Sequence, residues 1–390
     1  MYSSQDRKDR KSWMRILVDL TSLADNFSGI ERFAACITYE MLKQSDDDYI
    51  LVFKEKVYPL FDEFSSKKNV KIVVLQRCKK LVFNQFRLPI AINKEAADVY
   101  FFPSFPAPFF FFKRNAVSAI HDLGCWDCSS KNKRYMTLYF KIMYWKAALG
   151  KKRVVTVSEF SKHRIVEILK KDKSQVSVIY DGISDCFENF LYSEEEETRA
   201  KEEYKLPQSY ILCLSTVEPR KNMRLLVEAY DELLCEKKVN IDLVLAGRKG
   251  WLVDDLLSNL NSETVKRIHF TGFVDDELLP YVYKNAKMFV FPSVYEGFGI
   301  PPLEAMSMEV PVICSDAASL PEICGDAAIY FKSGDISKLK QSILELLSLE
   351  DNAIELLKTK GTAQAKKYNW KIEAGKVLTY LHKEFEGESK

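Results

Sequence analysis

Short, continuous apolar runs alternate with amphipathic stretches along the first half of the chain. In a parallel sheet covered by helices, strands are buried on both faces and have this continuous apolar character. The runs that predict strands are residues 15–20, 49–54, 70–75, 98–103, 116–122 and 153–158. Between them, residues 29–44 and 159–171 place apolar side chains at three-to-four spacing, which indicates helices packed on that sheet.

The same alternation restarts after an acidic segment, "YSEEEETRAKEEY" at 192–204, which we interpret as a solvated linker or surface helix. The strands predicted beyond it are residues 210–216, 241–247, 267–273, 287–293 and 310–316, with a helix at 223–237 and helical pattern over 335–386. Two such arrays predict an α/β fold of two Rossmann-like domains, at 14–190 and 205–369, with a cleft between them.

Composition agrees with a globular protein of two domains. The chain has 390 residues, of which 47% are hydrophobic and 29% charged. The first thirteen residues contain no apolar run, so we expect no signal peptide. The apolar run at 99–112 is interrupted by three prolines and is shorter than the roughly 20 residues of a membrane-spanning helix. We therefore expect a cytoplasmic protein, or one attached to the inner face of the membrane.

The net charge of the chain is +2, but its first half is basic and its second half is acidic. Residues 1–190 hold 32 lysines and arginines against 22 aspartates and glutamates, whereas the remainder holds 25 against 33. Residues 131–153 mix basic and aromatic side chains without any acidic residue, which suits an anionic membrane interface but equally suits an ordinary helix whose aromatic side chains face the core. No nucleic-acid-binding module is recognisable, and we expect no nucleic-acid partner.

Two short motifs are weak indications of metal binding. Cys125 and Cys128 have CxxC spacing, but no second CxxC accompanies them and structural zinc normally needs four ligands. The nine cysteines are scattered and are typical of buried thiols. Asp46 and Asp48 have DxD spacing but precede a predicted strand, so a solvated turn is the favoured interpretation. We expect no metal cofactor.

The candidate chemistry lies where predicted strands end. Ligands of doubly wound sheets bind at the carboxyl ends of the strands, near helix N-termini. Arg220 and Lys221 follow the strand at 210–216 and would suit a diphosphate there, although adjacent basic residues are also common on solvated surfaces. His121 ends the strand at 116–122 and Gly29 opens the first predicted helix. A structural role for His121 stays open.

The segment "PSVYEGFGIPPLEAM" at 292–306 places two carboxylates around glycines and prolines. The "GFG" within it would let the backbone pass close to a ligand, and Pro301 and Pro302 suit the first turn of a helix. We predict that Glu304 lies in that first turn, where the helix dipole favours its charge. A capping role would account for Glu304 but not for Glu296 or the glycines.

Together these motifs resemble the retaining glycosyltransferases of family 4. "EGFGIPPLE" is similar to the E-x7-E signature of that family, and "EPRKN", "IHD", "TVSEFSK" and "AGRKGW" match further segments in the same order. The resemblance implies the GT-B fold, in which residues from about 370 to 390 cross back to complete the first domain. The chain departs from the family in "FSGIERF", which is poorer in glycine, and in "YDGIS", where Asp181 and Ser184 replace an asparagine and an aspartate.

The resemblance also implies roles for individual residues. Arg220 and Lys221 would hold the diphosphate of a nucleotide-sugar, and His121 and Glu296 would contact the transferred sugar. Glu304 would bind the ribose of the donor, and Gly272 and Phe273 would lie near its base. Backbone N–H groups at Gly297, Phe298, Gly299 and Ile300 would help to hold its phosphates. Gly29 would contact the acceptor or a phosphate.

The expected activity is therefore metal-independent hexosyl transfer with retention of configuration. The resemblance to mannosyltransferases favours GDP-mannose as donor. The basic first domain favours attachment to an anionic membrane, and the acceptor would then be a lipid-linked saccharide, as in surface polysaccharide or lipopolysaccharide assembly. A UDP- or dTDP-sugar donor, and a non-catalytic sugar-nucleotide-binding scaffold, remain as alternatives.

Overall fold

A computed structural model describes residues 13–24, 29–128, 134–150, 152–216, 218–247 and 256–385. The chain forms two compact units. The first contains Met1–Gly182 and Asn369–Lys390, and the second contains Ile183–Tyr368. Each unit is built around its own parallel sheet.

The first unit holds a seven-stranded sheet in the order β3-β2-β1-β4-β5-β6-β7, and every pair in it is parallel. Its strands are β1 (Arg15–Asp19), β2 (Asp48–Lys54), β3 (Val70–Leu75), β4 (Val99–Phe102), β5 (Ala116–Ala119), β6 (Arg153–Thr156) and β7 (Val176–Val178). The central strands β4 and β5 are buried along their whole length, as their continuous apolar sequences predict.

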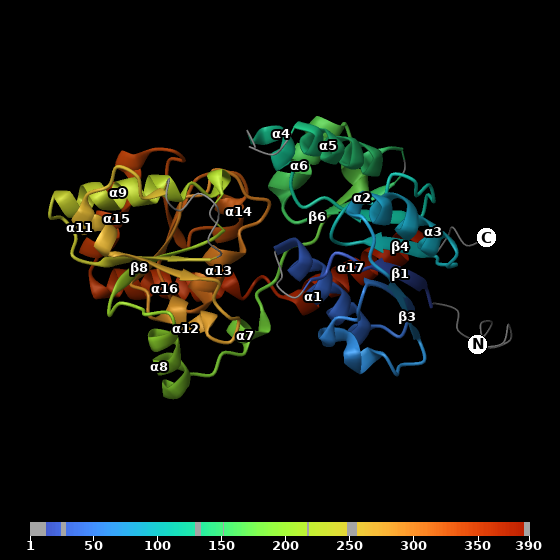
Figure 1. Cartoon of the computed structure of the whole chain (residues 1–390), viewed down its shortest axis with the longest axis horizontal. Helices are drawn as coiled ribbons and strands as arrows, with labels where there is room; N and C mark the ends of the chain where they lie inside the picture. Colours follow the sequence, from blue (N-terminus) through green and yellow to red (C-terminus); the bar gives the residue numbers. More distant parts are fainter. Residues whose placement is uncertain are drawn as a thin grey trace. The chain divides into compact units, whose positions relative to one another are not determined.

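Helices cover both faces of this sheet. They are α1 (Gly29–Gln44), α2 (Lys80–Val82), α3 (Leu88–Asn93), α4 (Gly124–Asp127), α5 (Arg134–Ala148), α6 (Glu159–Leu169) and α17 (Trp370–Phe385), with the 3-10 helices η1 (Pro59–Phe64) and η3 (Lys173–Gln175) and the π-helix η2 (Phe83–Arg87). The C-terminal helix α17 lies along α1 (Figure 1). Residues 369–390 thus return to the first unit, as the resemblance implied for residues from about 370.

The second unit repeats the arrangement with six parallel strands in the order β10-β9-β8-β11-β12-β13. They are β8 (Tyr210–Leu214), β9 (Asp242–Ala246), β10 (Ile268–Gly272), β11 (Met288–Phe291), β12 (Val312–Ser315) and β13 (Ala328–Phe331). In both units the sheet order reverses beside the first strand, and this switch point is where ligands bind in doubly wound folds.

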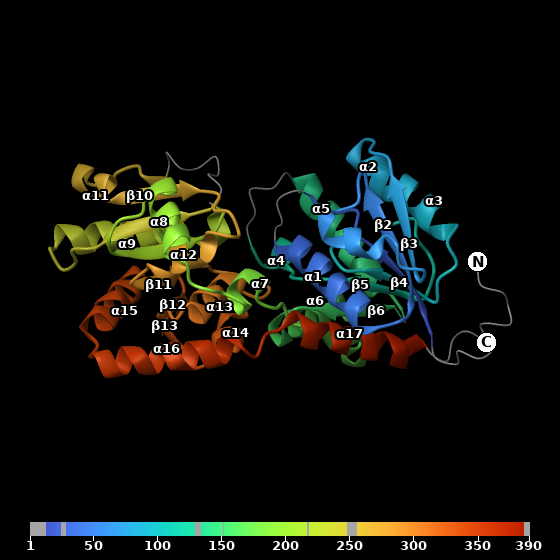
Figure 2. The same ribbon diagram turned by 90° about the horizontal axis from the view of Figure 1, so that it is seen from below.

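Helices α9 (Met223–Cys235) and α15 (Ile336–Ser348) pack together on one face of the second sheet, and α13 (Ile300–Ser307) packs with α16 (Asp351–Ala365) on the other (Figures 1 and 2). The other helical elements of this unit are α7 (Asp185–Glu188), α8 (Glu194–Glu203), η4 (Pro219–Lys221), α11 (Ser262–Lys266), α12 (Leu279–Lys284) and α14 (Leu320–Cys324). Leu226, Val227 and Leu243 lie in its fully buried core.

The sequence missed β7 and β13, the last strand of each sheet. Both are short edge strands with partly exposed residues, so they lack the fully buried pattern of a central strand. The predicted domain boundary at 190 was also wrong, because the first unit ends at Gly182. Residues 183–204 belong to the second unit and include α7 and α8 instead of forming a linker.

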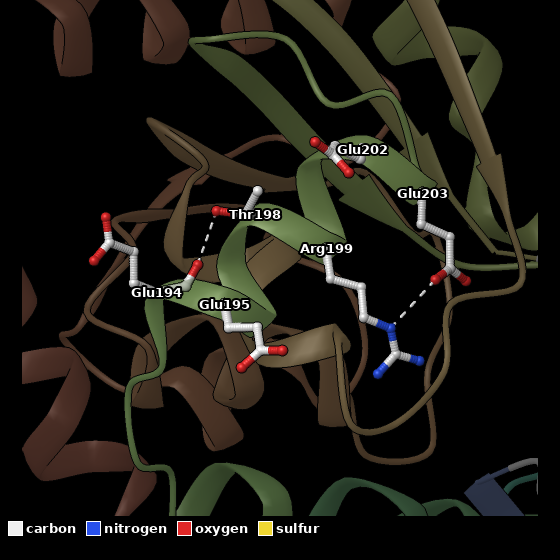
Figure 3. Close-up of a pocket in the computed structure, with 6 residues that line it drawn as sticks. All are labelled: Glu194, Glu195, Thr198, Arg199, Glu202 and Glu203. Carbon is white, nitrogen blue, oxygen red and sulfur yellow. Dashed lines mark hydrogen bonds and ion pairs between the residues drawn. The ribbon is translucent and has the colours of Figure 1, made fainter.

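The acidic segment forms a surface helix, α8, which was one of its two interpretations. Figure 3 shows a shallow hollow lined by α8 alone, where Thr198 Oγ1 donates to the Glu194 carbonyl at 2.9 Å and Arg199 pairs with Glu203 at 3.7 Å. These are ordinary contacts of neighbouring helical turns, and exposed pairs of this kind contribute about 0.3–0.5 kcal/mol. The hollow carries no candidate chemistry.

Candidate functional site

The switch point of the second sheet lies between β8 and β11, and the predicted cationic and acidic motifs meet there. Arg220 and Lys221 form η4 after β8, and Glu296 lies in the loop after β11. The backbone joins these two loops directly, since the Val294 N–H donates to the Arg220 carbonyl at 2.9 Å. Two segments 75 or so positions apart in sequence are thereby brought to one place.

Glu296 is the centre of the resulting charge cluster. Lys221 Nζ donates to its Oε1 at 2.7 Å, and an Arg220 guanidinium nitrogen lies 3.5 Å from its Oε2. The Glu296 side chain is only 7% exposed and Lys221 is 13% exposed, whereas Arg220 is 35% exposed and also pairs with Glu218 at 3.1 Å. The solvated-surface interpretation of Lys221 is therefore wrong, and Arg220 is the more accessible of the two cations.

Serine hydroxyls fix the cluster, and sequence reasoning missed them. The shortest contact of Ser293 Oγ is with Glu296 Oε1, at 2.6 Å. Ser319 Oγ lies 2.6 Å from the Phe298 carbonyl and 3.0 Å from the Glu296 carbonyl, so it anchors the loop backbone. Both serines are fully buried. The position of Ser293 directly beyond a buried strand, in "FVFPS", was the signal that could have identified it.

Electrostatics favours the ionised form of Glu296. Burial by itself raises the pKa of this carboxyl, but the charges of Lys221 and Arg220 and the hydrogen bonds of Lys221 and Ser293 outweigh it and lower the pKa below its ordinary 4.5. Lys221 Nζ also lies 5.4 Å from the centre of the Phe291 ring, close enough for a cation–π contact. The site therefore holds a preorganised pair of cations around one carboxylate.

The glycine and proline pattern shapes the start of α13. Gly299 has φ 116° and immediately precedes the helix, which begins at Ile300 with Pro301 and Pro302 in its first turn as predicted. The left-handed φ favours glycine here, whereas the space does not require it, because the atom nearest to a Cβ on Gly299 would be Leu320 Cδ2 at 2.8 Å, the end of a flexible side chain. Phe298 is buried against Tyr368, and its backbone together with that of Gly297 forms the turn between the two carboxylates.

The predicted place of Glu304 in the first helical turn is wrong. Because α13 begins at Ile300, Glu304 lies in the second turn and is buried, where it accepts a hydrogen bond from Tyr283 Oη of α12 at 2.9 Å. The N-terminal dipole effect fades within the first turn and does not explain this residue. Burying a carboxylate requires partners, and Tyr283 is one of them.

Gly272 and Phe273 lie at the end of β10, on the same edge of the sheet. The Gly247 N–H donates to the Gly272 carbonyl at 2.8 Å, and a Cβ on Gly247 would come within 2.3 Å of the Ser215 carbonyl oxygen. The ends of β8, β9 and β10 are thus packed backbone to backbone. Phe273 is 44% exposed. A role for Gly272 and Phe273 at a nucleotide base stays a prediction.

His121 lies in the first unit, in the loop after β5. Its Nε2 lies 2.8 Å from the Pro103 carbonyl, and because a carbonyl only accepts, Nε2 carries the proton and Nδ1 is the acceptor of the neutral ring. The ring packs edge-on against Phe33 at 5.0 Å. Burial lowers the pKa of His121 despite the opposing effects of this hydrogen bond and of Asp122.

Gly29 begins α1, as predicted, but the "DNFS" that precedes it at 25–28 lies outside the described residues. The nearby loops after β1 and β4 meet through the hydroxyls of Ser22 and Ser104, which lie 2.5 Å apart. This contact sits at the switch point of the first sheet, and the sequence reasoning did not identify it. The end of "AGRKGW", from residue 248, also lies outside the described residues.

Comparison with known proteins agrees with this geometry. The profile of the family described as "Glycosyl transferases group 1" matches residues 194–365, the segment that carries the charge cluster. The O-antigen chain mannosyltransferase B of Escherichia coli is 34% identical over 259 residues, which is 65% of this chain and 67% of that protein. The chain belongs to the group 1 glycosyltransferases.

Two further similarities bear on the length and fold of this glycosyltransferase family member. The serotype-specific mannosyltransferase WbdA of Escherichia coli is 31% identical over 220 residues, and the match covers 56% of this chain but only 27% of WbdA. A crystal structure of a glycosyltransferase from Rickettsia africae superposes with a TM-score of 0.72 at 19% identity, covering 97% of this chain and all of that one. The fold is GT-B, as the resemblance implied.

The weaker metal motifs of this glycosyltransferase acquire structural explanations. Cys125 lies in α4 and Cys128 directly follows it, and neither forms a disulfide. Burial, followed by the charge of Asp122, raises the pKa of Cys125 to about 12, which disfavours a reactive thiolate. Between Asp46 and Asp48, Asp47 is buried and accepts from the Met14 N–H at 2.9 Å, so this turn is not simply solvated.

Among the described residues, no group of three or more His, Cys, Asp and Glu side chains is arranged to hold a metal ion. A metal-independent reaction stays a prediction. In the same part of the chain, no helix combines the length and the apolarity needed to cross a membrane.

Proposed function

We propose that this group 1 glycosyltransferase is a retaining enzyme of family 4 that transfers mannose from GDP-mannose to a saccharide acceptor. The acceptor would be lipid-linked and the product a surface polysaccharide or lipopolysaccharide, with the protein in the cytoplasm or peripherally on the inner face of the membrane. The observation that carries the proposal is the Arg220–Lys221–Glu296 cluster at the switch point of the second sheet. The choice of mannose is supported by the similarity to O-antigen mannosyltransferases.

Arg220 and Lys221 would stabilise the leaving group, which is the nucleoside diphosphate of the donor. As the bond between the anomeric carbon and the diphosphate breaks, negative charge collects on the departing phosphate oxygens, and preorganised donors stabilise it. Glu296 holds Lys221 and Arg220 in place before the substrate arrives, since both contact its carboxylate. The partly exposed Arg220 would reach the outer oxygens and the more buried Lys221 the inner ones.

Glu296 would also orient hydroxyls of the transferred sugar, because a carboxylate fixed by Ser293 and Lys221 still has lone pairs for further donors. Glu304 would accept from the ribose hydroxyls, Gly297 to Ile300 would present their backbone to the phosphates, and Gly272 with Phe273 would border the base. His121, neutral with Nδ1 as an acceptor, would contact the sugar. Gly29 would contact the acceptor or a phosphate.

Retention would follow a front-face course. The anomeric C–O bond to the diphosphate breaks, a new C–O bond to the acceptor oxygen forms on the same face, and the acceptor proton passes to a departing phosphate oxygen. Glu296 is committed to two cations and to Ser293, which makes it a poor covalent nucleophile. Trapping of a covalent sugar–protein intermediate with a slow donor analogue would overturn this course.

A donor panel tests the proposal. Thermal shift and donor hydrolysis would be measured with GDP-mannose, UDP-sugars and dTDP-sugars, each with and without a chelator. Selective stabilisation by GDP-mannose with slow, chelator-resistant hydrolysis is expected. Selectivity for a UDP- or dTDP-sugar would show that GDP-mannose is not the donor. Loss of hydrolysis in chelator would contradict metal independence. Binding without turnover on any donor would favour the non-catalytic scaffold.

A further inference from the structure

Helix α5 exposes an apolar stripe to solvent. The stripe repeats at alternating intervals of three and four residues, so its side chains lie on one face of the helix. Its members are Tyr135, Leu138, Ile142 and Trp145, continued by Leu149 directly after the helix, and Leu138 is 59% and Trp145 55% exposed. The opposite face is buried through Met143 and Ala147, so the helix packs on its own unit and still presents a second apolar face.

Two neighbouring segments add to this stripe. The loop after β4 exposes Phe105, Phe109, Phe110 and Phe112, and the α2–η2–α3 segment exposes Leu81, Val82, Phe86 and Ile90. Phe86 and Phe110 connect the two segments, with ring centres 5.2 Å apart. We call these three segments together the aromatic surface. Contiguous exposed apolar surface of this extent marks an interaction site in soluble proteins.

Buried polar side chains hold the aromatic surface in shape. Gln85 of η2 donates from Nε2 to Tyr139 Oη of α5 at 2.6 Å, and its Oε1 accepts from the Phe109 N–H at 2.7 Å. One buried amide therefore joins all three segments. Because the amide uses both ends, the exposed side chains are displayed on a fixed scaffold.

Lys146 of α5 supports the loop from beneath. Its Nζ donates to the Pro108 carbonyl at 2.9 Å and to the Phe111 carbonyl at 3.0 Å, and it lies within 5 Å of the Phe109 and Phe112 ring centres. The lysine is 6% exposed, while Phe112 above it is 70% exposed. A buried charge thus orders the loop that carries the most exposed aromatic side chain.

The three segments that carry the aromatic surface bear charges of one sign. Residues 76–94, 103–114 and 131–153, which carry its three segments, contain no aspartate or glutamate and many lysines and arginines. Lys79, Lys80, Arg87 and Arg114 are exposed there. An isologous dimer would set this face against itself and oppose its positive charges, so a second copy of the chain is a poor partner.

We propose that the aromatic surface docks on the interface of an anionic lipid bilayer. Tryptophan, tyrosine and phenylalanine side chains suit the headgroup boundary, and basic residues beside them attract anionic lipids. This inference deepens the proposed location at a membrane and would bring a lipid-linked acceptor to the first unit. The docking itself does not depend on the identity of the donor.

Flotation of the full chain on vesicles tests the surface. Vesicles of equimolar phosphatidylcholine and phosphatidylglycerol would be compared with phosphatidylcholine alone, at low and high salt. We expect binding to the anionic vesicles that weakens with salt, and about a tenfold or larger loss of partition for Leu138→Glu. Leu356→Glu is the matched control, because Leu356 is a helical leucine of 57% exposure on α16 of the second unit.

Equal flotation of Leu138→Glu and the wild type, or none of the wild type, overturns the proposal. Equal binding to neutral vesicles overturns the requirement for anionic lipid, and lipid-free self-association that Leu138→Glu abolishes would assign the surface to a second copy. Phe112→Ser, in the loop, provides a second variant should Leu138→Glu unfold. Donor hydrolysis in lipid-free solution separates the two proposals, since it reports on the second unit whether or not vesicles bind.

Discussion

The two sheets share one strand order at their switch points but carry different chemistry there. In the second unit, the loops after β8 and β11 meet through a carboxylate and two cations. In the first unit, the loops after β1 and β4 meet through two serine hydroxyls, and the nearby His121 is held neutral by burial. The fold fixes where a ligand can bind, whereas the residues at the strand ends decide which charge is stabilised there.

The contrast suits a reaction in which one partner is a diphosphate and the other a neutral sugar or hydroxyl. The second unit supplies fixed positive charge, which anionic phosphates need. The first unit supplies neutral donors and acceptors around Ser22, Ser104 and His121, which suit hydroxyl groups. Variants in each unit test whether the second unit binds phosphate and the first unit binds neutral hydroxyl groups.

The largest expected effect comes from removing a cation in the second unit. Lys221→Ala should lower turnover by about 10²–10³, the usual scale for one lost charge-stabilising donor. Steady-state transfer or donor hydrolysis measures it. Arg224→Ala is the control, because Arg224 lies on the following helix, α9, and pairs with Glu228 one turn away. Near-normal turnover of Lys221→Ala would remove the cationic site from the mechanism.

A smaller effect is expected when the carboxylate at the centre of the cluster is neutralised. Glu296→Gln should cost about 1–3 kcal/mol of stability at neutral pH, since a buried charge-assisted hydrogen bond is weakened. The pKa of Glu296 is lowered in the folded state, so its contribution is complete above about pH 4.5 and is lost as the pH falls through the lowered value.

Thermal unfolding of both proteins as a function of pH measures this difference. The gap between wild type and Glu296→Gln should therefore close on acidification below the ordinary value of 4.5. A gap that stays constant down to pH 3 or so would mean that the carboxylate is not stabilised by its cations.

The smallest effect concerns the neutral side of the comparison. Burial lowers the pKa of His121 from 6.5, so the folded protein resists a proton that the unfolded chain accepts. The contribution of the neutral His121 to the free energy of unfolding is fully present above about pH 6.5 and is lost as the pH falls through the lowered pKa. Titration of the imidazole ring followed by NMR should give a pKa of His121 below 6.5, with the proton of the neutral ring on Nε2. A pKa above 6.5 would break the contrast between the two switch points.

Much of the fold was predictable because central parallel strands have an unmistakable sequence pattern. The buried strands β4, β5 and β11 are continuous apolar runs, whereas the edge strands β7 and β13 are short and partly exposed and gave no such signal. The boundary at Gly182 was missed because the acidic polarity of α8 suggested a linker. Polarity identifies a solvated face but does not distinguish a surface helix from a connection.

The candidate site was predictable in its charged residues and not in their support. Arg220, Lys221 and Glu296 were identifiable because each follows a predicted strand, and such positions converge in a doubly wound sheet. Ser293 also directly follows a buried strand, which was a usable signal, but Ser319 carried none, since a serine has no preference that marks it as a buried donor. Glu304 was assigned to the wrong helical turn because the sequence does not show whether α13 begins at Ile300 or later.

The central claim is that the cluster after β8 and β11 binds the diphosphate of the donor. The most direct test is calorimetric titration of GDP and GMP into the wild type and Lys221→Met, with the uridine nucleotides run in parallel. The account predicts that the wild type prefers the diphosphate by tenfold or so, as expected for one charge-assisted contact, and that Lys221→Met loses most of this preference. An equal preference for the diphosphate in both proteins would contradict the account.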